Sequence, residues 1–223
     1  MKLPDYYRNT KNRTENWKSR ENARDALENS LRALPELSGK WIDIGCQSGG
    51  LLNKLGTNFE EAVGVDIGNY SDYWKESPNV NFVIHDLDEG PICFPDSYFD
   101  LVTCFMVIEH VFDVFGALNE IARLTKTSGS VVVEIPNAGY FKHILSLIRG
   151  IVPRTGAQDY PFNETQGWDG QHLHYFTLSE FVAASHRYDL QLISHNTRGR
   201  FPALRRIAPS LLYSSLILTF RKQ

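Results

Sequence analysis

The chain has 223 residues, of which 42% are hydrophobic, and this is enough to bury the core of a single α/β domain. Its formal net charge of −3 argues against a general attraction to DNA or RNA, because nucleic-acid binding needs a basic face that neutralises phosphates. The three cysteines, Cys46, Cys93 and Cys104, have no Cys-x-x-Cys spacing and indicate neither a disulfide framework nor a zinc site.

Cysteines in or beside apolar segments are typical of a reducing compartment. The N-terminal segment lacks the apolar stretch of a signal peptide, and no run approaches the roughly 20 apolar residues of a membrane-spanning helix. We therefore expect a cytoplasmic protein without an integral membrane segment.

Residues 1–39 are predicted to form an N-terminal arm that ends in an amphipathic helix. Apolar side chains recur at helical spacing from residue 26 to residue 34, so this helix is expected to pack on the core. Three aromatic residues precede it: Tyr6, Tyr7 and Trp17. They either pin the arm to the core or close over a bound ligand as a lid.

The core domain is expected over residues 40–223. Short apolar runs alternate with helical segments, an order typical of parallel βαβ units with right-handed connections. The first predicted strands are Lys40–Ile44, Ala62–Asp66 and Val80–His85, and the helices between them are Gly50–Leu55 and roughly Tyr70–Lys75.

A turn of small residues, from Gly45 to Gly49, follows the first strand. Glycines leave room for a ligand, and the free N–H groups of a helix that begins near Ser48 suit a polar or anionic group. Asp66 ends the second strand about 20 residues further on, where a carboxylate binds a ribose diol in nucleotide-binding units. For the turn alone, close packing of a helix on a strand is the alternative.

The next elements complete a covered sheet. A fourth strand is expected to end at Cys104, a helix to span Val114–Leu124, and a fifth strand to span Ser130–Ile135 after a turn at residues 127–129. Three consecutive valines in the fifth strand are apolar on both faces, which is typical of a central strand.

A long insertion is predicted over about residues 137–178. It contains one short apolar helix, Phe141–Ile148, and a loop of this length in a compact domain usually has a function. Thr177 or Ser179 is a plausible cap for the helix that follows.

The chain finishes with two β-like runs, Leu190–His195 and Leu211–Phe220, which are predicted to form a closing hairpin at the sheet edge. Four arginines gather between the two runs, in Arg198–Arg206. This segment is either a solvated loop or a contact for an anionic acceptor or an anionic membrane surface.

Five segments stand in a fixed order: Asp43-Ile44-Gly45-Cys46 with Gly49, Val65-Asp66, Asp86, residues 94–102, and Ile108-Glu109-His110-Val111. From about Lys40 to Asn137 they resemble the class I S-adenosylmethionine-dependent methyltransferase family. Residues 86–90, 135–139 and 172–177 resemble the branch of that family that includes the methionine-biosynthesis protein W and many small-molecule and glycan-cluster methyltransferases.

The resemblance implies a Rossmann-like, doubly wound α/β fold. Its sheet would have seven mostly parallel strands with the last one antiparallel, and S-adenosylmethionine would lie across the carboxyl ends of strands one to four. Asp66 would accept both ribose hydroxyls, Ile67 would pack on the adenine, and Asp86 would accept from the adenine amino group with Leu87 alongside.

The methionine part of the cofactor would lie against the glycine turn. The resemblance assigns this part to Gly45, Cys46, Gln47 and Gly49, with Asp43 near the amino group and the backbone of Phe105 or Met106 at the flank. Gln47 departs from the family, which usually has a second glycine there, so its side chain either points outward or crowds the ligand.

Methyl transfer needs mainly the alignment of donor and acceptor, so a general base is optional. His110 and His172 are the candidate catalytic residues, although His110 is about as well explained as a packing residue at a helix start. Glu109, Asn137, Tyr140 and His174 are candidates for the acceptor pocket. No metal is expected, because His172 and His174 lack a nearby third ligand in the sequence.

The predicted function is transfer of a methyl group from S-adenosylmethionine to an oxygen or nitrogen of a small molecule, with S-adenosylhomocysteine as the other product. A sugar or another anionic metabolite would fit the arginine segment. The alternatives are a non-catalytic relative that binds a protein partner, or itself as a homodimer, and a nucleotide-dependent oxidoreductase. The last lacks the Gly-x-Gly-x-x-Gly spacing of dinucleotide sites.

Overall fold

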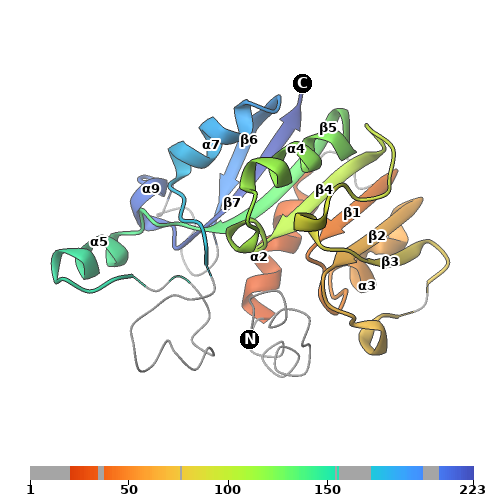
Figure 1. The fold of residues 1–223 in the computed structure, drawn as a ribbon, viewed down its shortest axis with the longest axis horizontal. Helices are drawn as coiled ribbons and strands as arrows, with labels where there is room; N and C mark the ends of the chain where they lie inside the picture. Colours follow the sequence, from red (N-terminus) through yellow and green to blue (C-terminus); the bar gives the residue numbers. More distant parts are fainter. Residues whose placement is uncertain (1–20, 35–37, 76, 154, 156–171, 198–205) are drawn as a thin grey trace.

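A computed structural model describes residues 21–34, 38–75, 77–153, 155, 172–197 and 206–223. In these residues the strands form one seven-stranded sheet in the order β3-β2-β1-β4-β5-β7-β6 (Figure 1). The strands are β1 Lys40–Ile44, β2 Glu61–Asp66, β3 Val80–Ile84, β4 Phe99–Phe105, β5 Thr125–Pro136, β6 Leu190–Asn196 and β7 Ser215–Lys222.

The first five strands are parallel, and the strand order reverses between β1 and β4. The carboxyl ends of parallel strands meet at one edge of a sheet, and ligands of open α/β sheets bind at such a reversal point. The predicted doubly wound fold is confirmed.

The predicted closing hairpin is also confirmed in its pairing, since β6 and β7 are antiparallel neighbours. However, β7 lies between β5 and β6 and pairs with both, so of the two hairpin strands only β6 is an edge strand. Residues 215–220 of β7 are buried, as an internal strand with two covered faces requires.

Side chains that alternate along the strands divide the core between the two faces of the sheet. Ile42 of β1 belongs to the cluster covered by α4 (Val114–Leu124) and α7 (Leu178–His186). Trp41 belongs to the cluster covered by α2 (Glu21–Arg32) and α3 (Leu52–Leu55).

Two predicted elements were wrong in detail. The helix expected at residues 70–75 is only a single 3₁₀ turn, Ser71–Tyr73, because the Asn69 side chain accepts a hydrogen bond from the Ser71 N–H and favours a turn. The run at 211–220 is split, because Pro209 occupies the first position of a short helix, α9 (Pro209–Leu212), before β7 begins.

Other boundaries moved by a few residues. The first predicted helix shortens to α3 and continues as a 3₁₀ turn at Gly56–Asn58. β5 begins earlier than expected, but its pairing with β4 shifts register near the predicted turn, where Ser128 has a φ of 62°. Thr177 is the cap of α7 and forms a capping box with Glu180, as predicted.

The insertion after β5 begins as expected with α5, Phe141–Ile148. None of its residues is buried, and Figure 1 shows it projecting away from the sheet. The expectations for Tyr6, Tyr7 and Trp17, for residues 156–171 of the insertion, and for arginines 198, 200 and 205 lie outside the described residues. None of the helices in the described part of the chain has the length and apolar character that crossing a bilayer requires.

Because Leu31 of α2 is fully buried in the cluster with Trp41, the N-terminal helix is expected to stabilise the core. Leu31→Ala should lower the free energy of unfolding by about 2–5 kcal/mol, as a buried leucine truncation usually does. Chemical denaturation measures this value. Asn29→Ala, at an exposed position of the same helix, is the control and should change it by no more than about 0.5 kcal/mol. If Leu31→Ala lowered the free energy of unfolding no more than Asn29→Ala does, the helix would not be part of the core.

Candidate functional site

The carboxyl ends of β1, β2, β3 and β4 surround a hollow that is partly open to solvent, and we call it the β1–β4 hollow. It is lined by Ile44, Gly45, Gln47, Val65, Asp66, Ile67, His85, Asp86, Leu87, Asp88, Phe105, Met106, Val107, His110, Val111 and Phe112.

Two carboxylates from neighbouring strands face this hollow. Asp66 ends β2, and its two oxygens accept hydrogen bonds from the N–H groups of Gly68 and Gln47, at 2.8 and 2.9 Å. Asp86 follows β3 and accepts from the Asp88 N–H at 3.0 Å. A carboxylate offers about four lone-pair sites, so each of these side chains can accept more than one hydrogen bond.

The turn after β1 is held by the backbone of β2. The N–H groups of Gly45 and Cys46 both donate to the Val65 carbonyl, at 2.7 and 3.1 Å. Gly45 has a φ of 79°, and a Cβ at this position would lie 2.0 Å from Val107 Cγ2. A glycine is therefore needed here, so that the loop after β4 can approach the turn.

Gln47 takes a backbone conformation that glycine adopts more readily, with a φ of 48°. Its N–H donates to Asp66, and its carbonyl accepts from the indole nitrogen of Trp74 at 2.8 Å. Met106, across the hollow, has a φ of 57°. Residues in this sparsely populated region often lie at functional sites, and both of these line the hollow.

Three residues that the resemblance assigned to the cofactor lie behind the lining and not in it: Asp43, Cys46 and Gly49. A Cβ on Gly49 would lie 2.7 Å from the Phe82 ring, so this glycine serves close packing. Cys46 is buried, and desolvation raises the pKa of its thiol. Close packing, the alternative explanation for the glycine turn, thus accounts for Gly49, whereas Gly45 and Gln47 line the hollow.

Asp43 is buried below the turn on the face of the sheet that carries Trp41. Its carboxylate accepts a hydrogen bond of 2.6 Å from the Thr103 hydroxyl, which in turn accepts from the indole N–H of Trp41 at 2.8 Å. Burial raises the pKa of Asp43 to about 7, against the lowering effect of the Thr103 hydrogen bond. Sequence reasoning missed Thr103, although a threonine inside the apolar strand β4 was a signal for such a partner.

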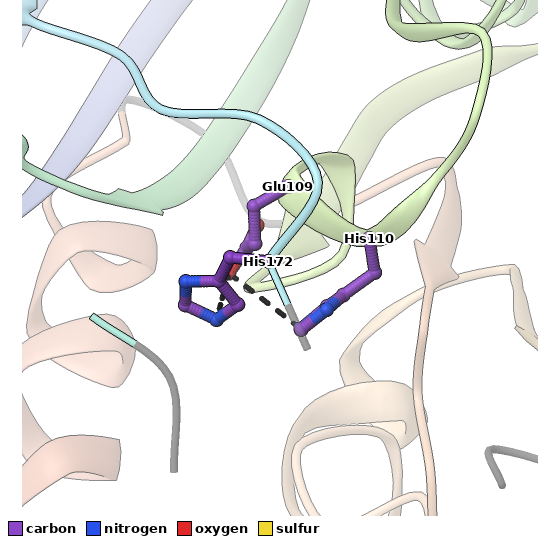
Figure 2. A group of neighbouring side chains, drawn as sticks. All are labelled: Glu109, His110 and His172. Carbon is purple, nitrogen blue, oxygen red and sulfur yellow. Dashed lines mark ion pairs between the residues drawn. The ribbon is translucent and has the colours of Figure 1, made fainter. Parts of the chain in front are cut away.

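At one end of the hollow lies a group that we call the Glu-His-His cluster, which consists of Glu109, His110 and His172 (Figure 2). Glu109 Oε1 is 3.9 Å from His110 Nε2 and 4.0 Å from His172 Nε2. The two imidazole rings meet edge to face with centroids 4.7 Å apart. His110 also lines the hollow, so it connects the cluster with that space.

Two backbone hydrogen bonds hold His172 at the cluster. The N–H groups of Leu173 and His174 donate to the Glu109 carbonyl, at 2.8 and 3.3 Å. His174 points elsewhere, because its Nε2 lies 2.9 Å from the Val111 carbonyl. The two histidines therefore contact different groups, since the chain bends at Leu173 between them.

Asn137 and Tyr140 do not line the hollow either. The Asn137 amide is buried; it donates to the carbonyls of Ser210 and Tyr213 and accepts from the Gly139 N–H. Its side chain therefore fixes the start of the insertion on the segment before β7, which is a structural role. Tyr140 precedes α5, and its ring packs against Phe141 and His143.

Comparison with known proteins finds methyltransferases by family, by sequence and by structure. Residues 17–195 match the family described as "Methyltransferase domain". The ubiquinone biosynthesis O-methyltransferase of Methylococcus capsulatus is 26% identical over 141 residues, which are 58% of this chain and 59% of that protein. The chain thus spans about three fifths of the length of this curated relative.

Solved structures share the fold along the whole chain. An S-adenosylmethionine-dependent methyltransferase from Thermotoga maritima superposes with a TM-score of 0.69 at 15% identity, and all of both chains is covered. A methyltransferase from Haloferax volcanii, solved in complex with the Trm112 methyltransferase activator, gives a TM-score of 0.68 at 14% identity over 99% of this chain and 97% of that chain.

The raised pKa of Asp43 predicts a pH-dependent stability. Because the folded state holds the Asp43 proton up to about pH 7 and the unfolded state releases it near pH 4, the contribution of Asp43 to stability is greatest below pH 4 and is lost as the pH rises through 7. Asp43→Asn stays neutral and should not show this loss, which amounts to a few kcal/mol at most. Denaturant titrations of both proteins without ligand at pH 5 and pH 8 measure the difference. Parallel pH profiles would show that Asp43 is ionised throughout.

Proposed function

The chain belongs to the methyltransferase-domain family, and we propose that it transfers the methyl group of S-adenosylmethionine to an oxygen or nitrogen atom of a small-molecule acceptor. The single observation that carries this proposal is that Asp66 and Asp86 face one hollow together with the turn at Gly45 and Gln47. These groups match the parts of the donor, which has a ribose diol, an adenine with an amino group and a charged amino-acid tail.

Each part of the donor has a partner of suitable chemistry. Asp66 would accept from the ribose hydroxyls while it keeps its bonds to the turn, and Asp86 would accept from the adenine amino group. Ile67 and Leu87 supply apolar surface for the adenine ring. The methionine end would lie between Gly45, Gln47 and the backbone near Met106.

The reaction is an in-line displacement at the methyl carbon. A lone pair of the acceptor would form the new bond to carbon while the carbon–sulfur bond breaks, and its electron pair would stay on sulfur to give S-adenosylhomocysteine. The proton of the acceptor would pass to solvent. The protein mainly has to bring acceptor and methyl group into contact in the right orientation.

We propose that His110 and His172 act at the acceptor end. His110 lines the hollow, and the ring of His172 packs edge to face against the ring of His110. Glu109 lies behind both and is fully buried, with Oε1 3.9 Å from His110 Nε2 and 4.0 Å from His172 Nε2.

The acceptor is proposed to bind under the insertion at about residues 137–178, as part of a single domain that spans 40–223. His172 belongs to this insertion and reaches the end of the hollow, which supports the proposal. The arginines at 198–206 suit an acceptor with a negative charge, such as a phosphorylated or nucleotide-linked sugar.

A protein partner is a second proposal for the same chain. The Haloferax volcanii relative was solved with a methyltransferase activator, and α5 of this chain exposes apolar side chains. An exposed apolar surface of this kind is typical of a protein contact.

Calorimetry with S-adenosylmethionine and S-adenosylhomocysteine tests the donor site. Both should bind, and Asp66→Asn should weaken them by about 5- to 150-fold, because a buried donor of the ligand loses a charged acceptor. Asp72→Asn, at an exposed position just beyond β2, is the matched control and should bind as the wild type does.

Two outcomes would contradict the proposal. Binding of NAD in place of the methyl donor would support the oxidoreductase, and unchanged affinity in Asp66→Asn would remove this residue from the site. Release of S-adenosylhomocysteine over a panel of metabolites then separates an enzyme from a binding protein.

A further inference from the structure

The Glu-His-His cluster brings together three side chains of the kinds that bind metal ions. One ligand atom from each of Glu109, His110 and His172 lies within 4.8 Å of the others. They come from two distant parts of the sequence, since Glu109 and His110 follow β4 and His172 belongs to the insertion (Figure 2). No metal was expected from the sequence, because His172 and His174 have no third ligand near them in the chain, and only the fold brings Glu109 and His110 to His172.

The distances are close to those of a coordination shell. Ligand atoms about 2.0–2.2 Å from a tetrahedral ion are about 3.3 Å from one another. The separations from Glu109 Oε1 to the two imidazole nitrogens, 3.9 and 4.0 Å, exceed this value by less than about 1 Å. Small side-chain rotations would bring the three ligand atoms to coordination distance. Both separations start from the same oxygen, Glu109 Oε1.

The surroundings orient the ligands. His172 Nδ1 lies 2.7 Å from the Thr155 hydroxyl, so a proton on Nδ1 can be donated to Thr155 while the lone pair of Nε2 faces Glu109. Metal-binding histidines usually have such a partner on the other ring nitrogen. The backbone bonds from residues 173 and 174 to the Glu109 carbonyl fix the two segments against each other.

Burial adds to the argument. Glu109 is fully buried, and the side chains of His172 and His110 are only 3% and 15% exposed. A cation bound between the three ligands would therefore be largely shielded from solvent.

We propose that Glu109, His110 and His172 bind a divalent transition-metal ion of the zinc type. Two imidazoles and one carboxylate suit zinc, whereas magnesium and calcium prefer oxygen ligands alone. Three protein ligands leave a coordination position open, as in catalytic zinc sites. Because His110 lines the β1–β4 hollow, this position is accessible to a molecule that enters it.

The role of the ion rests on the proposed methyl transfer. An acceptor hydroxyl beside a divalent cation loses its proton more easily, because the cation favours the negatively charged oxygen. The acceptor would then be an oxygen nucleophile, and the proton would pass to solvent without a general base. The site therefore favours a hydroxyl acceptor over an amine.

Metal binding by the full chain tests the site directly. The purified protein is treated with a chelator and dialysed against Zn²⁺, and elemental analysis should find one ion per chain with no comparable binding of Mg²⁺. His172→Ala and His110→Ala should each weaken Zn²⁺ binding by at least about tenfold. His186→Ala removes an exposed histidine of α7 and should bind as the wild type does.

Cobalt provides a readout that distinguishes loss of a ligand from misfolding. Co²⁺ in place of zinc should give visible absorption bands, and these should be lost in His110→Ala, whose partly exposed side chain is expected to be dispensable for folding. Thermal unfolding of each variant confirms that it is folded. Failure of the wild type to bind zinc, or equal binding by the wild type and both histidine variants, would overturn the site.

The test also separates the two proposals. Calorimetry with S-adenosylmethionine examines the donor site alone, without added metal. A chain that binds zinc at the cluster but does not bind the methyl donor would retain the metal site and contradict methyl transfer. A chain that binds the donor but not zinc would contradict only the metal site.

Discussion

The Asp66 carboxylate is the contact on which the hollow depends. It accepts from Gln47 in the turn after β1 and from Gly68 beyond its own strand, so one side chain joins two neighbouring strand ends. The turn is further tied to β2 by the Val65 carbonyl, which accepts from Gly45 and Cys46. As a result the shape of the hollow is largely set before a ligand arrives, and little ordering would be needed on binding.

Two buried polar side chains inside the sheet, Asp43 and Thr103, are joined by a hydrogen bond. Thr103 lies beside Asp43 in the register of β1 and β4, and it joins that carboxylate to the indole of Trp41. The same burial that raises the pKa of Asp43 places a group that titrates near neutrality under the turn. A positively charged ligand above the turn would favour its ionised form.

The insertion after β5 contributes to the site through a few fixed points. Asn137 anchors its start, and the hydrogen bonds of Leu173 and His174 to Glu109 anchor its end. These contacts fix the two ends of the insertion relative to the sheet.

The sequence by itself determined the order of strands and helices, the glycine turn and the two carboxylates that face the hollow, because hydrophobic periodicity and strand ends are local properties. It also indicated the family, through motifs in a fixed order. Only the tertiary structure decided that Asp43, Cys46 and Gly49 lie outside the lining of the hollow, and that Asn137 binds the backbone of the segment before β7. Only the tertiary structure, too, brings His172 to Glu109 and His110 while His174 points away. These outcomes depend on packing between segments that are far apart in the sequence, such as the contact of His174 with Val111 across 63 residues, and no local pattern specifies such a contact.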